Sequence, residues 1–309
     1  MNLHRWKKLG LLYCPPALGR HHKLLSHAAN PLPVHLEGDV YRVFYSGRDE
    51  SNRSSVGAVD IDISRQEVIR DHFEPFFVHG PAGSFHADGV SIGNCYEIDG
   101  RRFMLFMGWQ APKDRQWRGD IGRLEVLPDL TLRLESEAPF MTSDDTDPLS
   151  LSYPWVMKDK SHQFSMWYGS TLSWNAGNGE MLHVIQHATS SDGQRWKRLG
   201  LAVPYQLGQA QAFSRPTVVR ESAACLAMWF SYRSGSGQKY RIGRAVSQDD
   251  GETWQLALDQ SGMDVSTCGW DSEMIEYPFV FDHADRRYML YNGNGYGRTG
   301  FGLAVLDET

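Results

Sequence analysis

Two nearly identical heptapeptides, far apart in the chain, constrain the fold more than any other feature of the sequence. RWKKLGL occupies residues 5–11 and RWKRLGL occupies residues 195–201, and the two differ only at their fourth position. The second copy follows SSDGQ, in which an Asp-Gly pair is typical of the tight turn between antiparallel strands. The first copy has no such turn before it. We therefore expect residues 5–11 to be an outer strand of a sheet whose other strands come from elsewhere in the chain.

A longer repeat runs through the rest of the sequence at regular spacing. Each of five copies begins with an apolar run opened by Pro or Gly: ANPLPV, ADGVSI, SYPWVM, SRPTVV and EYPFVF. The residues before this Pro or Gly are Asn30, Asp88, Tyr153, Arg215 and Tyr277. Because a proline favours extended backbone at the residue before it, we expect these five residues to begin the innermost strands in extended conformation.

Two more strand-like segments follow in each copy. The first is rich in aromatic residues, as in YRVFYSG and FSMWYG, and the second has a small residue at its centre. That small residue is glycine in four copies (Gly57, Gly122, Gly243 and Gly302), as expected where a large aromatic side chain of a neighbouring strand needs room. Short β-branched and aromatic runs separated by Gly, Asp and Asn are typical of an all-β fold.

The last copy ends at LAVLDET without a fourth strand, and RWKKLGLLYCP at the other end of the chain can supply one. This arrangement predicts an all-β, five-bladed β-propeller of four-stranded antiparallel blades, with the ring closed by the N-terminal strand completing the last blade. Residues 1–309 are expected to form this single domain.

Composition excludes several other classes of protein. A net charge of −6 argues against nucleic acid as a partner. No apolar run approaches the roughly 18 residues of a membrane span, and MNLHRWKKLG lacks a signal-peptide pattern, so we expect neither a membrane partner nor export. Cys14, Cys95, Cys225 and Cys268 form no CxxC pair, which favours reduced thiols and a cytoplasmic location. No cofactor is indicated, and the oligomeric state stays open.

Propeller topology places the ligand site at one face of the ring. The starts of the first strands and the hairpins between the second and third strands share that face, and the hairpins are rich in Trp, Asn and Arg. Aromatic rings stack on sugars, and amides offer paired donors and acceptors. The candidate carbohydrate-binding residues are Asn30, Arg48, Asp49, His86, Trp109, Tyr153, Trp174, Arg215, Arg233, Asn292, Asn294 and Arg298.

Basic residues outnumber acidic ones in these hairpins, although the whole chain is acidic. The bases are Arg48, Arg53, Lys113, Arg115, Arg118, Arg233, Lys239, Arg241 and Arg298, and the acids are Asp49, Glu50, Asp114, Asp120 and Glu180. This excess favours an anionic ligand, such as an acidic sugar or a sugar phosphate. The alternative is that the bases pair with neighbouring acids or only face solvent.

These features resemble the superfamily of arabinanases, invertases and levansucrases, which includes glycoside hydrolase family 43 and the related mannoside phosphorylases. The resemblance covers the whole chain and rests on the five copies, their polar-residue-plus-Pro openings and SSDGQRW. It implies acidic residues on the first three inner strands. Asn30 stands where the first would be, Asp88 is kept, and blade three offers only Asp147 upstream of its strand. Asn30 also resembles the mannoside phosphorylases, which bind phosphate with basic side chains.

Glycoside cleavage by two carboxylates therefore has four candidates. Asp88 is the first, because Arg215 could hold it ionised. Glu276 is the second, because its apolar neighbours could raise its pKa as a general acid requires. Glu273 replaces Glu276 if that side chain turns away from the channel, and Asp147 is the remaining carboxylate. The alternative for Asp88 and Glu276 is a bracing role in the channel.

Pairs of histidines and acids were also considered as metal ligands. His86 and Asp88 form an H-x-D pair, and His183 and His187 fall on one side of a strand, but packing is the commoner role of such histidines, so no metal is expected. The predicted function is a glycoside hydrolase acting on a charged or decorated glycan at the channel face. The alternatives are a glycoside phosphorylase and a catalytically inactive glycan-binding propeller of a polysaccharide assembly system.

Overall fold

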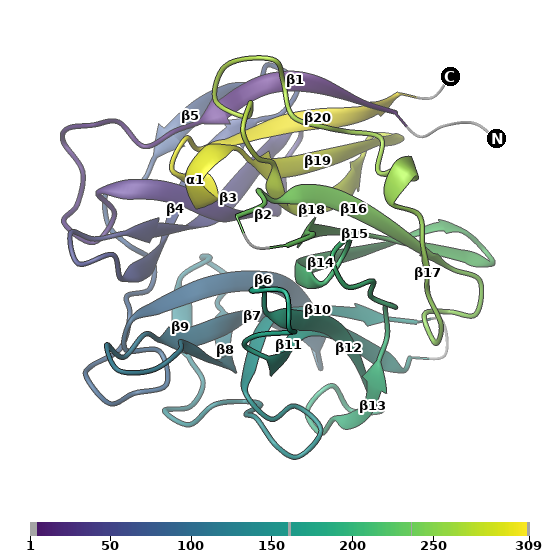
Figure 1. Cartoon of the computed structure of the whole chain (residues 1–309). Coiled ribbons are helices and arrows are strands. Elements are labelled where there is room, and N and C mark those ends of the chain that lie inside the picture. Colours follow the sequence, from purple (N-terminus) through teal and green to yellow (C-terminus); the bar gives the residue numbers. More distant parts are fainter. Residues whose placement is uncertain (1–4, 160–161, 236, 308–309) are drawn as a thin grey trace.

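A computed structural model describes residues 5–159, 162–235 and 237–307 (Figure 1). Almost all of the regular structure is β-strand. The helical elements in the described ranges are a single 3₁₀ turn, η1 (Leu258–Gln260), and a four-residue turn, α1 (Asn294–Gly297). No helix in these ranges is long and apolar enough to cross a membrane. The predicted all-β class is confirmed.

Antiparallel pairing divides the strands into five four-stranded units, which we number along the chain. Unit 1 contains β2 (Ser26–Glu37), β3 (Val40–Arg48), β4 (Ser54–Asp62) and β5 (Glu67–Asp71). Unit 2 contains β6 (Gly89–Ile98), β7 (Arg101–Gln110), β8 (Arg118–Val126) and β9 (Leu132–Leu134). Unit 3 contains β10 (Ser150–Lys158), β11 (Phe164–Ser173), β12 (Leu182–Ser190) and β13 (Lys197–Leu201).

The last two units follow the same order. Unit 4 contains β14 (Ala212–Ser222), β15 (Cys225–Arg233), β16 (Arg241–Ser247) and β17 (Gln255–Leu256). Unit 5 contains β18 (Glu276–His283), β19 (Arg286–Asn292), β20 (Phe301–Asp307) and β1 (Arg5–Tyr13). Single parallel pairs join units 1 and 2 and units 3 and 4, so the hydrogen-bonded strands form two eight-stranded sheets and one four-stranded sheet.

The N-terminal strand completes the sheet of unit 5, as its sequence predicts. β1 pairs antiparallel with β20, from Arg5 opposite Asp307 to Tyr13 opposite Phe301, and the two strands lie side by side in Figure 1. Trp6 is buried and packs edge-to-face on Trp229 of unit 4, with ring centroids 5.6 Å apart. The first strand of the chain therefore contacts the neighbouring unit as well as its own.

The inner strands of successive units lie against one another. β2 contacts β6, β6 contacts β10, β10 contacts β14, β14 contacts β18, and β18 contacts β2. Side chains also link these strands to the next backbone. The Asn94 amide exchanges two hydrogen bonds with Val156, at 2.8 and 2.9 Å, and the Thr217 hydroxyl accepts one from Val280 N–H at 3.2 Å. The five inner strands therefore lie around one common centre.

Each inner strand carries a β-bulge, and the bulges correct one predicted register. In units 1, 3, 4 and 5 the bulge falls at the residue before proline, and in unit 2 it falls between Ile92 and Cys95. Gly93 is therefore the counterpart of Asn30, and equating Asp88 with Asn30 was wrong. Unit 2 has Asn94 where the other units have proline, which is why the Pro pattern did not find it.

The bulge residues are not extended, which is a second correction. Asn30, Tyr153, Arg215 and Tyr277 have φ values of 56°, 36°, 47° and 52°. This left-handed region is costly for residues other than glycine, by about 1 to 3 kcal/mol each. The local preference of a residue before proline is overridden here by the bulge, which turns these four side chains out of the strand's alternation.

The glycines at the centres of the third strands leave room for large aromatic rings, as the sequence predicts. A Cβ on Gly57 would lie 2.6 Å from the Tyr45 ring, and one on Gly122 would lie 2.2 Å from the Phe106 ring. Both rings belong to the adjacent strand and are fully buried. The prediction is confirmed for these two glycines and for Gly243, which faces Phe230, whereas the ring close to Gly302 is that of Trp270, in the loop before β18.

Candidate functional site

Glu276 is the most unusual ionisable group near the common centre. It is the first residue of β18 and has no exposed surface. Neither carboxylate oxygen makes a hydrogen bond of standard length and angle among the described residues, although the backbone N–H of Tyr296 is close enough to act on the group. Burial raises the pKa of Glu276 well above its ordinary value, and the charges of Arg48 and Arg233 and the N–H of Tyr296 offset this in part. The neutral carboxylic acid is therefore favoured in the folded protein.

Tyrosines from three units surround this acid. The Tyr153 hydroxyl donates to the Tyr277 hydroxyl at 3.3 Å, and their ring centroids lie 5.3 Å apart. Burial raises the pKa of Tyr153, Tyr240 and Tyr277, and a charge on Glu276 would raise each further. Tyr296, on α1, is 41% exposed and stands edge-on to the Tyr240 ring. The site is thus walled by aromatic rings that carry hydroxyl groups.

Two basic groups act on Glu276 from different units. The Arg48 guanidinium donates to the Asn52 side chain at 2.7 Å. Arg233 lies over the Tyr240 ring at 5.0 Å and pairs with Glu180, with 2.7 Å between Nε and Oε2. Glu180 neutralises the charge of Arg233. Arg48, in contrast, forms no ion pair with a carboxylate in the described chain.

His27 lies beside Arg48 and Arg298 at the edge of the same site. Burial lowers the pKa of His27 to about 4, and the charges of Arg48 and Arg298 lower it as well. Its imidazole therefore stays neutral near pH 7. Arg298 is exposed and follows α1. Arg48 and Arg298 therefore concentrate positive charge between units 1 and 5, beside a neutral His27.

Arg215 lies at the centre but does not hold Asp88 ionised. Its guanidinium is 2% exposed and donates to the carbonyl oxygens of Tyr277 at 3.2 Å, Pro31 at 2.9 Å and Gly93 at 3.5 Å. These carbonyls belong to the bulges of three other units. Burial lowers the pKa of Arg215 to about 9, and Tyr153 and Tyr277 raise it. From the sequence we expected a ligand or Asp88 as the partner of Arg215, whereas its hydrogen bonds go to backbone carbonyl oxygens.

The other candidate carboxylates lie outside the group around Glu276. Asp88 precedes β6 and accepts a hydrogen bond from Ala111 N–H at 2.8 Å. Asp147 is fully buried and accepts from the Tyr168 hydroxyl and Arg198, both at 2.7 Å. Glu273 is exposed. No carboxylate is among the groups that shift the pKa of Glu276 in the described chain.

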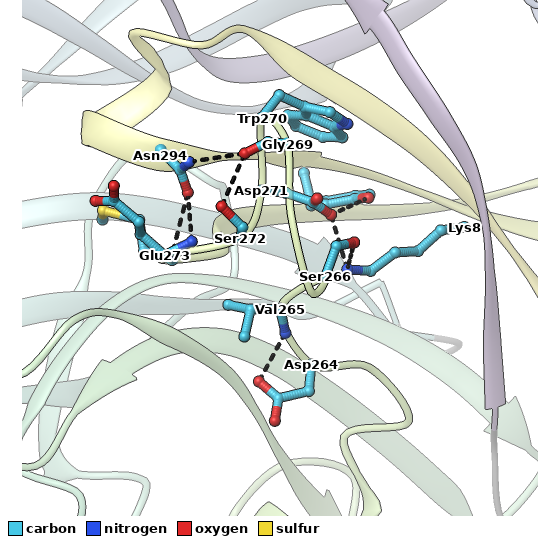
Figure 2. Close-up of polar contacts among 12 residues, drawn as sticks. Lys8, Asp264, Val265, Ser266, Gly269, Trp270, Asp271, Ser272, Glu273 and Asn294 are labelled. Atoms are coloured by element: carbon cyan, nitrogen blue, oxygen red, sulfur yellow. Dashed lines mark hydrogen bonds and ion pairs between the residues drawn. The ribbon is translucent and has the colours of Figure 1, made fainter.

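The candidate amides differ in how far their hydrogen bonds are already made. Asn292 accepts from Asn30 N–H and donates to the carbonyls of Ala28 and Gly300, at 2.7 to 2.9 Å. Figure 2 shows Asn294 accepting from Glu273 N–H at 2.8 Å and donating to the carbonyl of Gly269. The side-chain amides of Asn292 and Asn294 are therefore hydrogen-bonded to backbone groups of the protein. The Asn30 side-chain nitrogen, in contrast, is buried without a partner in the described residues.

The loop before β18 is anchored to the N-terminal strand. Lys8 of β1 forms an ion pair with Asp271 at 2.7 Å and donates to Ser266 at 3.0 Å, as Figure 2 shows. Asp271 also accepts from the Tyr291 hydroxyl at 3.1 Å. Because this loop leads directly into β18, β1 helps to fix the backbone that carries Glu276.

The remaining predicted residues lie toward units 1 to 3. Asp49 pairs with Arg53 at 3.0 Å, and the Trp109 indole donates to Ser54 at 3.1 Å. His86 is buried and stacks on Phe77, with centroids 5.8 Å apart. Trp174 is half-buried and meets the Trp117 ring edge-on at 5.1 Å. Trp174 also lines a cavity together with Trp117 and Arg115.

Local pairing accounts for part of the basic excess in the hairpins. The pairs are Arg53 with Asp49, Arg118 with Asp120, Arg233 with Glu180 and Arg241 with Asp264, at 2.7 to 3.1 Å. Arg48, Arg115 and Arg298 have no carboxylate partner among the described residues. Four of the arginines are thus paired with acids, as the alternative to an anionic ligand expected. The other three arginines could bind an anion.

The histidines considered as metal ligands have other partners. His183 contacts the Ser152 hydroxyl at 2.6 Å and the Thr171 hydroxyl at 2.7 Å, so both ring nitrogens are occupied. His187 stacks on Trp167, with ring planes 6° apart. Within residues 5–159, 162–235 and 237–307, no three His, Cys, Asp or Glu side chains are grouped as a metal site requires.

Comparison with known proteins places this site in a family context. No family model matches the sequence. Uncharacterized protein MT1551 and Uncharacterized protein Rv1502, both from Mycobacterium tuberculosis, are each 43% identical to this chain over 305 residues, which is 98% of this chain and 99% of theirs. The chain belongs to the family of these two proteins.

Solved structures with low sequence identity share the fold of this chain. A glycoside hydrolase matches with a TM-score of 0.72 at 15% identity, covering 98% of this chain and 92% of its own. A structure from the GH130 family of mannoside phosphorylases, which contains glycoside hydrolases that target β-1,2 mannosidic linkages in Candida mannan, matches at 0.71, with 12% identity and coverage of 98% and 94%. A thermostable family-43 glycoside hydrolase matches at 0.65, with 15% identity and coverage of 96% and 92%.

These structures confirm the predicted resemblance to the arabinanase, family 43 and mannoside phosphorylase superfamily. The family thus has the fold of glycoside hydrolases and phosphorylases, whose ligands are carbohydrates. Two residues of the Glu276 site, His27 and Tyr240, were not selected from the sequence. Tyr240 directly precedes the third strand of its unit, as an aromatic residue at a strand end, whereas nothing in the sequence around His27 distinguishes it.

Proposed function

We propose that this protein cleaves glycosidic bonds, with Glu276 as the general acid. One observation carries the proposal: a wholly buried carboxyl group without a hydrogen-bond partner in the described chain, whose pKa burial raises. Burying such a group costs free energy. We therefore infer that the group is retained for a function other than stabilising the fold. A general acid must hold its proton until the leaving oxygen needs it, and a raised pKa achieves this near neutral pH.

In the proposed reaction, Glu276 donates its proton to the glycosidic oxygen as the bond to the anomeric carbon breaks. The carboxylate that remains is stabilised by Arg48 and Arg233, whose charges act on Glu276. The hydroxyls of Tyr153 and Tyr277 lie at the site to bind sugar hydroxyls. In hydrolysis, our first choice, a water attacks the anomeric carbon and the proton that it loses returns to the Glu276 carboxylate.

Substrate must uncover Glu276, because this side chain has no exposed surface. Tyr296 is the exposed neighbour whose N–H acts on Glu276. Its φ of 60° and the φ of 69° at Gly295 put two consecutive residues of α1 in the left-handed region. A non-glycine residue there costs free energy, so displacement of this turn by a sugar relieves strain.

A second candidate reaction is phosphorolysis. Two-carboxylate hydrolysis needs a base or nucleophile roughly 5 to 9.5 Å from the acid, and no carboxylate is among the groups acting on Glu276 in the described chain. Inorganic phosphate is itself a nucleophile and needs no general base. Arg48 and Arg298, which have no carboxylate partner among the described residues, are suited to hold it. Without catalysis, the same groups would make a glycan-binding propeller, which is our third candidate.

The proposed substrate carries negative charge. Arg48, Arg115 and Arg298 lie on the hairpins of three units without carboxylate partners in the described ranges, which favours an acidic or phosphorylated sugar. Asn30 offers an unused amide nitrogen to such a ligand. We do not assign Arg215 to the ligand, because its donors already meet three carbonyls.

The experiment distinguishes water from inorganic phosphate as the group that accepts the sugar. Wild-type protein and Glu276→Gln would be incubated with neutral and acidic oligosaccharides, with and without inorganic phosphate, and the products separated by anion-exchange chromatography. Free sugar formed without phosphate supports hydrolysis, and a sugar 1-phosphate formed only with phosphate supports phosphorolysis. Equal turnover in both proteins would remove Glu276 from the mechanism, and no turnover with retained binding would favour the glycan-binding alternative.

We further propose that the five units are the blades of one closed five-bladed propeller formed by residues 1–309. The pairing of β1 with β20 and the contacts between successive inner strands support this arrangement. Deleting residues 1–13 would expose the edge of β20 and should cause aggregation or unfolding. An unchanged melting temperature in the truncated protein would contradict closure by β1.

A cytoplasmic location is proposed on the cysteines alone. Cys14, Cys95, Cys225 and Cys268 are all free thiols, and Cys14 and Cys268 are exposed. Unpaired, exposed thiols are typical of a reducing compartment. Fractionation of the source cells with an antibody against the protein would test this assignment.

A further inference from the structure

A cavity between units 2 and 3 lies beside the hairpin from β7 to β8. Its volume is about 300 Å³, which is the size of a small ligand site. The side chains that matter for its chemistry are Gln110, Arg115, Gln116, Trp117, Leu149 and Trp174. No acidic side chain is among the residues that line it.

Two indole rings form the apolar wall of this cavity. Trp117 and Trp174 are half-buried and meet edge-on, with centroids 5.1 Å apart and planes at 74°. Neither indole N–H takes part in a hydrogen bond within the residues that the structure describes. Aromatic rings with an unused polar group suit ligands that present C–H faces and hydroxyls at once, as sugar rings do. Gln116 adds an amide that is also free of partners in that part of the chain.

Arg115 supplies an unbalanced charge at the cavity. It is exposed and has no ion-pair partner in the described ranges, whereas its neighbour Arg118 is held by Asp120 at 3.1 Å. Arg115 also lines a second cavity of about 460 Å³, together with Arg53 and His79. The two cavities share Gln110, Pro112 and Arg115, so they meet at this hairpin. A planar carboxylate is a good partner for a free guanidinium.

The cavity is connected to the Glu276 site by a short series of contacts. The Trp117 ring lies 6.0 Å from His183, which contacts the Ser152 hydroxyl at 2.6 Å. The next residue, Tyr153, donates to Tyr277 beside Glu276. The lining of the cavity is therefore linked to the Glu276 site through buried side chains, and Glu276 is not among the residues that line the cavity.

We propose that this cavity is a second carbohydrate-binding site, which takes an acidic sugar unit of a longer glycan. The sugar ring stacks on Trp117 or Trp174, its hydroxyls bond to the indole N–H groups and to Gln116, and its carboxylate meets Arg115. The proposal rests on the proposed carbohydrate ligand but not on cleavage at Glu276. Its role is to hold a long substrate while another unit of the same glycan reaches Glu276.

The test uses an array of immobilised neutral and acidic oligosaccharides two to six units long. Wild type and Glu276→Gln should bind at least one acidic oligosaccharide, and Trp117→Ala and Trp174→Ala should each weaken that binding about tenfold, since a stacked ring contributes about 1.4 kcal/mol. Arg115→Gln should weaken binding of acidic members and leave neutral analogues unchanged. Lys113→Gln is the matched control, because Lys113 is an exposed cation of the same hairpin that lines neither cavity.

Thermal unfolding of each variant would show that the fold is kept, and Trp174→Phe, which retains a ring, should restore most of the binding. Failure of wild type and Glu276→Gln to bind any oligosaccharide would overturn the second site. So would full binding by both tryptophan variants, or binding that is lost only in Glu276→Gln. Binding at Trp117 and Trp174 with no cleavage by wild type would instead contradict the proposed enzyme and leave this site standing.

Discussion

Glu276 and Arg215 are two buried ionisable side chains at the centre of the molecule, and they differ in their hydrogen bonds. Arg215 stands at the bulge of unit 4, and Glu276 precedes the bulge of unit 5 by one residue. Arg215 donates to three carbonyl oxygens from three units. Glu276 has no hydrogen-bond partner in the described chain. The hydrogen-bonding groups of Arg215 are thus engaged by the fold, whereas those of Glu276 are not.

The comparison teaches that burial alone does not identify a functional group. Both side chains are almost inaccessible, at 2% and 0% exposed. A buried polar group with satisfied hydrogen bonds stabilises the surrounding backbone, whereas one without partners costs free energy and is retained only for another reason. The distinguishing observation is therefore the state of the hydrogen bonds, and the following predictions test it.

The largest effect is expected from Arg215→Met. This change keeps much of the side-chain volume but leaves the carbonyls of Pro31, Gly93 and Tyr277 without a donor, so we expect a loss of about 3 kcal/mol in the free energy of unfolding. Urea denaturation measures it. Arg102→Met, which removes an exposed ion pair with Glu97, should change stability by less than about 0.5 kcal/mol. Wild-type stability in Arg215→Met combined with weaker ligand binding would return Arg215 to the ligand site.

The next effect is on catalysis. Glu276→Gln should lower kcat by about a hundredfold or more, because the amide cannot donate the proton, while the fold stays intact. Glu273→Gln is the matched control, since Glu273 is exposed in the preceding loop and should change kcat by less than about threefold. Asp88→Asn should also have a small effect, because Asp88 lies outside the group around Glu276. A large loss in Asp88→Asn and none in Glu276→Gln would reverse the assignment.

A third difference should appear in the pH dependence of stability. The folded protein keeps the Glu276 proton above the pKa of the unfolded chain, about 4.3. The unfolded state then binds fewer protons, so this group makes the free energy of unfolding fall as pH rises from about 4.3 through the raised pKa, by at most about 1.4 kcal/mol per pH unit. Glu276→Gln should remove that decline.

The buried histidines act in the opposite direction and are present in both proteins. Burial lowers the pKa of His27 and His187 to about 4, so stability rises with pH between about 4 and 6.5. Subtracting the Glu276→Gln curve from the wild-type curve isolates the acid. Parallel curves across pH 4 to 8 would mean that Glu276 does not hold a proton in the folded state.

The smallest effect is expected from Arg48→Gln. The charge of Arg48 lowers the pKa of Glu276, so its removal should raise that pKa and move the alkaline limb of the kcat/KM profile to higher pH. A pH series on wild type and variant measures the shift. Lys239→Gln, in a hairpin of unit 4, serves as the control for a lost positive charge. An unchanged alkaline limb in Arg48→Gln would show that another group sets it.

The fold was more predictable from the sequence than the site. Periodic aromatic runs and glycines repeat because each unit solves the same packing problem, and Gly57 and Gly122 confirm it. The heptapeptide at residues 5–11 could be assigned as an outer strand because it repeats the outer strand of unit 3, and it does pair with β20. Unit 2 was misaligned because it has Asn94 at the position where the other units have proline.

The site depends on contacts between units, which no local pattern records. Arg215 would have the same sequence context whether it met a ligand or three carbonyls. Glu276 was a candidate from its apolar neighbours, but its missing hydrogen bonds follow from strands far apart in the chain. The acid-base pairs of the hairpins also required the structure, because only distances separate a paired arginine from a free one.

The pairing of β1 with β20 has a consequence for biosynthesis. Arg5 meets Asp307, and units 1 to 4 lie between β1 and β20 in the chain, so β1 finds its partner only after those four units have been synthesised. Units 1 to 4 can fold from contiguous segments as they emerge, whereas unit 5 needs a contact of very high sequence separation, which slows folding. Until then β1 is an unpaired strand that could bind a neighbouring nascent chain. The positive charges of Arg5, Lys7 and Lys8 on this strand disfavour pairing with another copy of it.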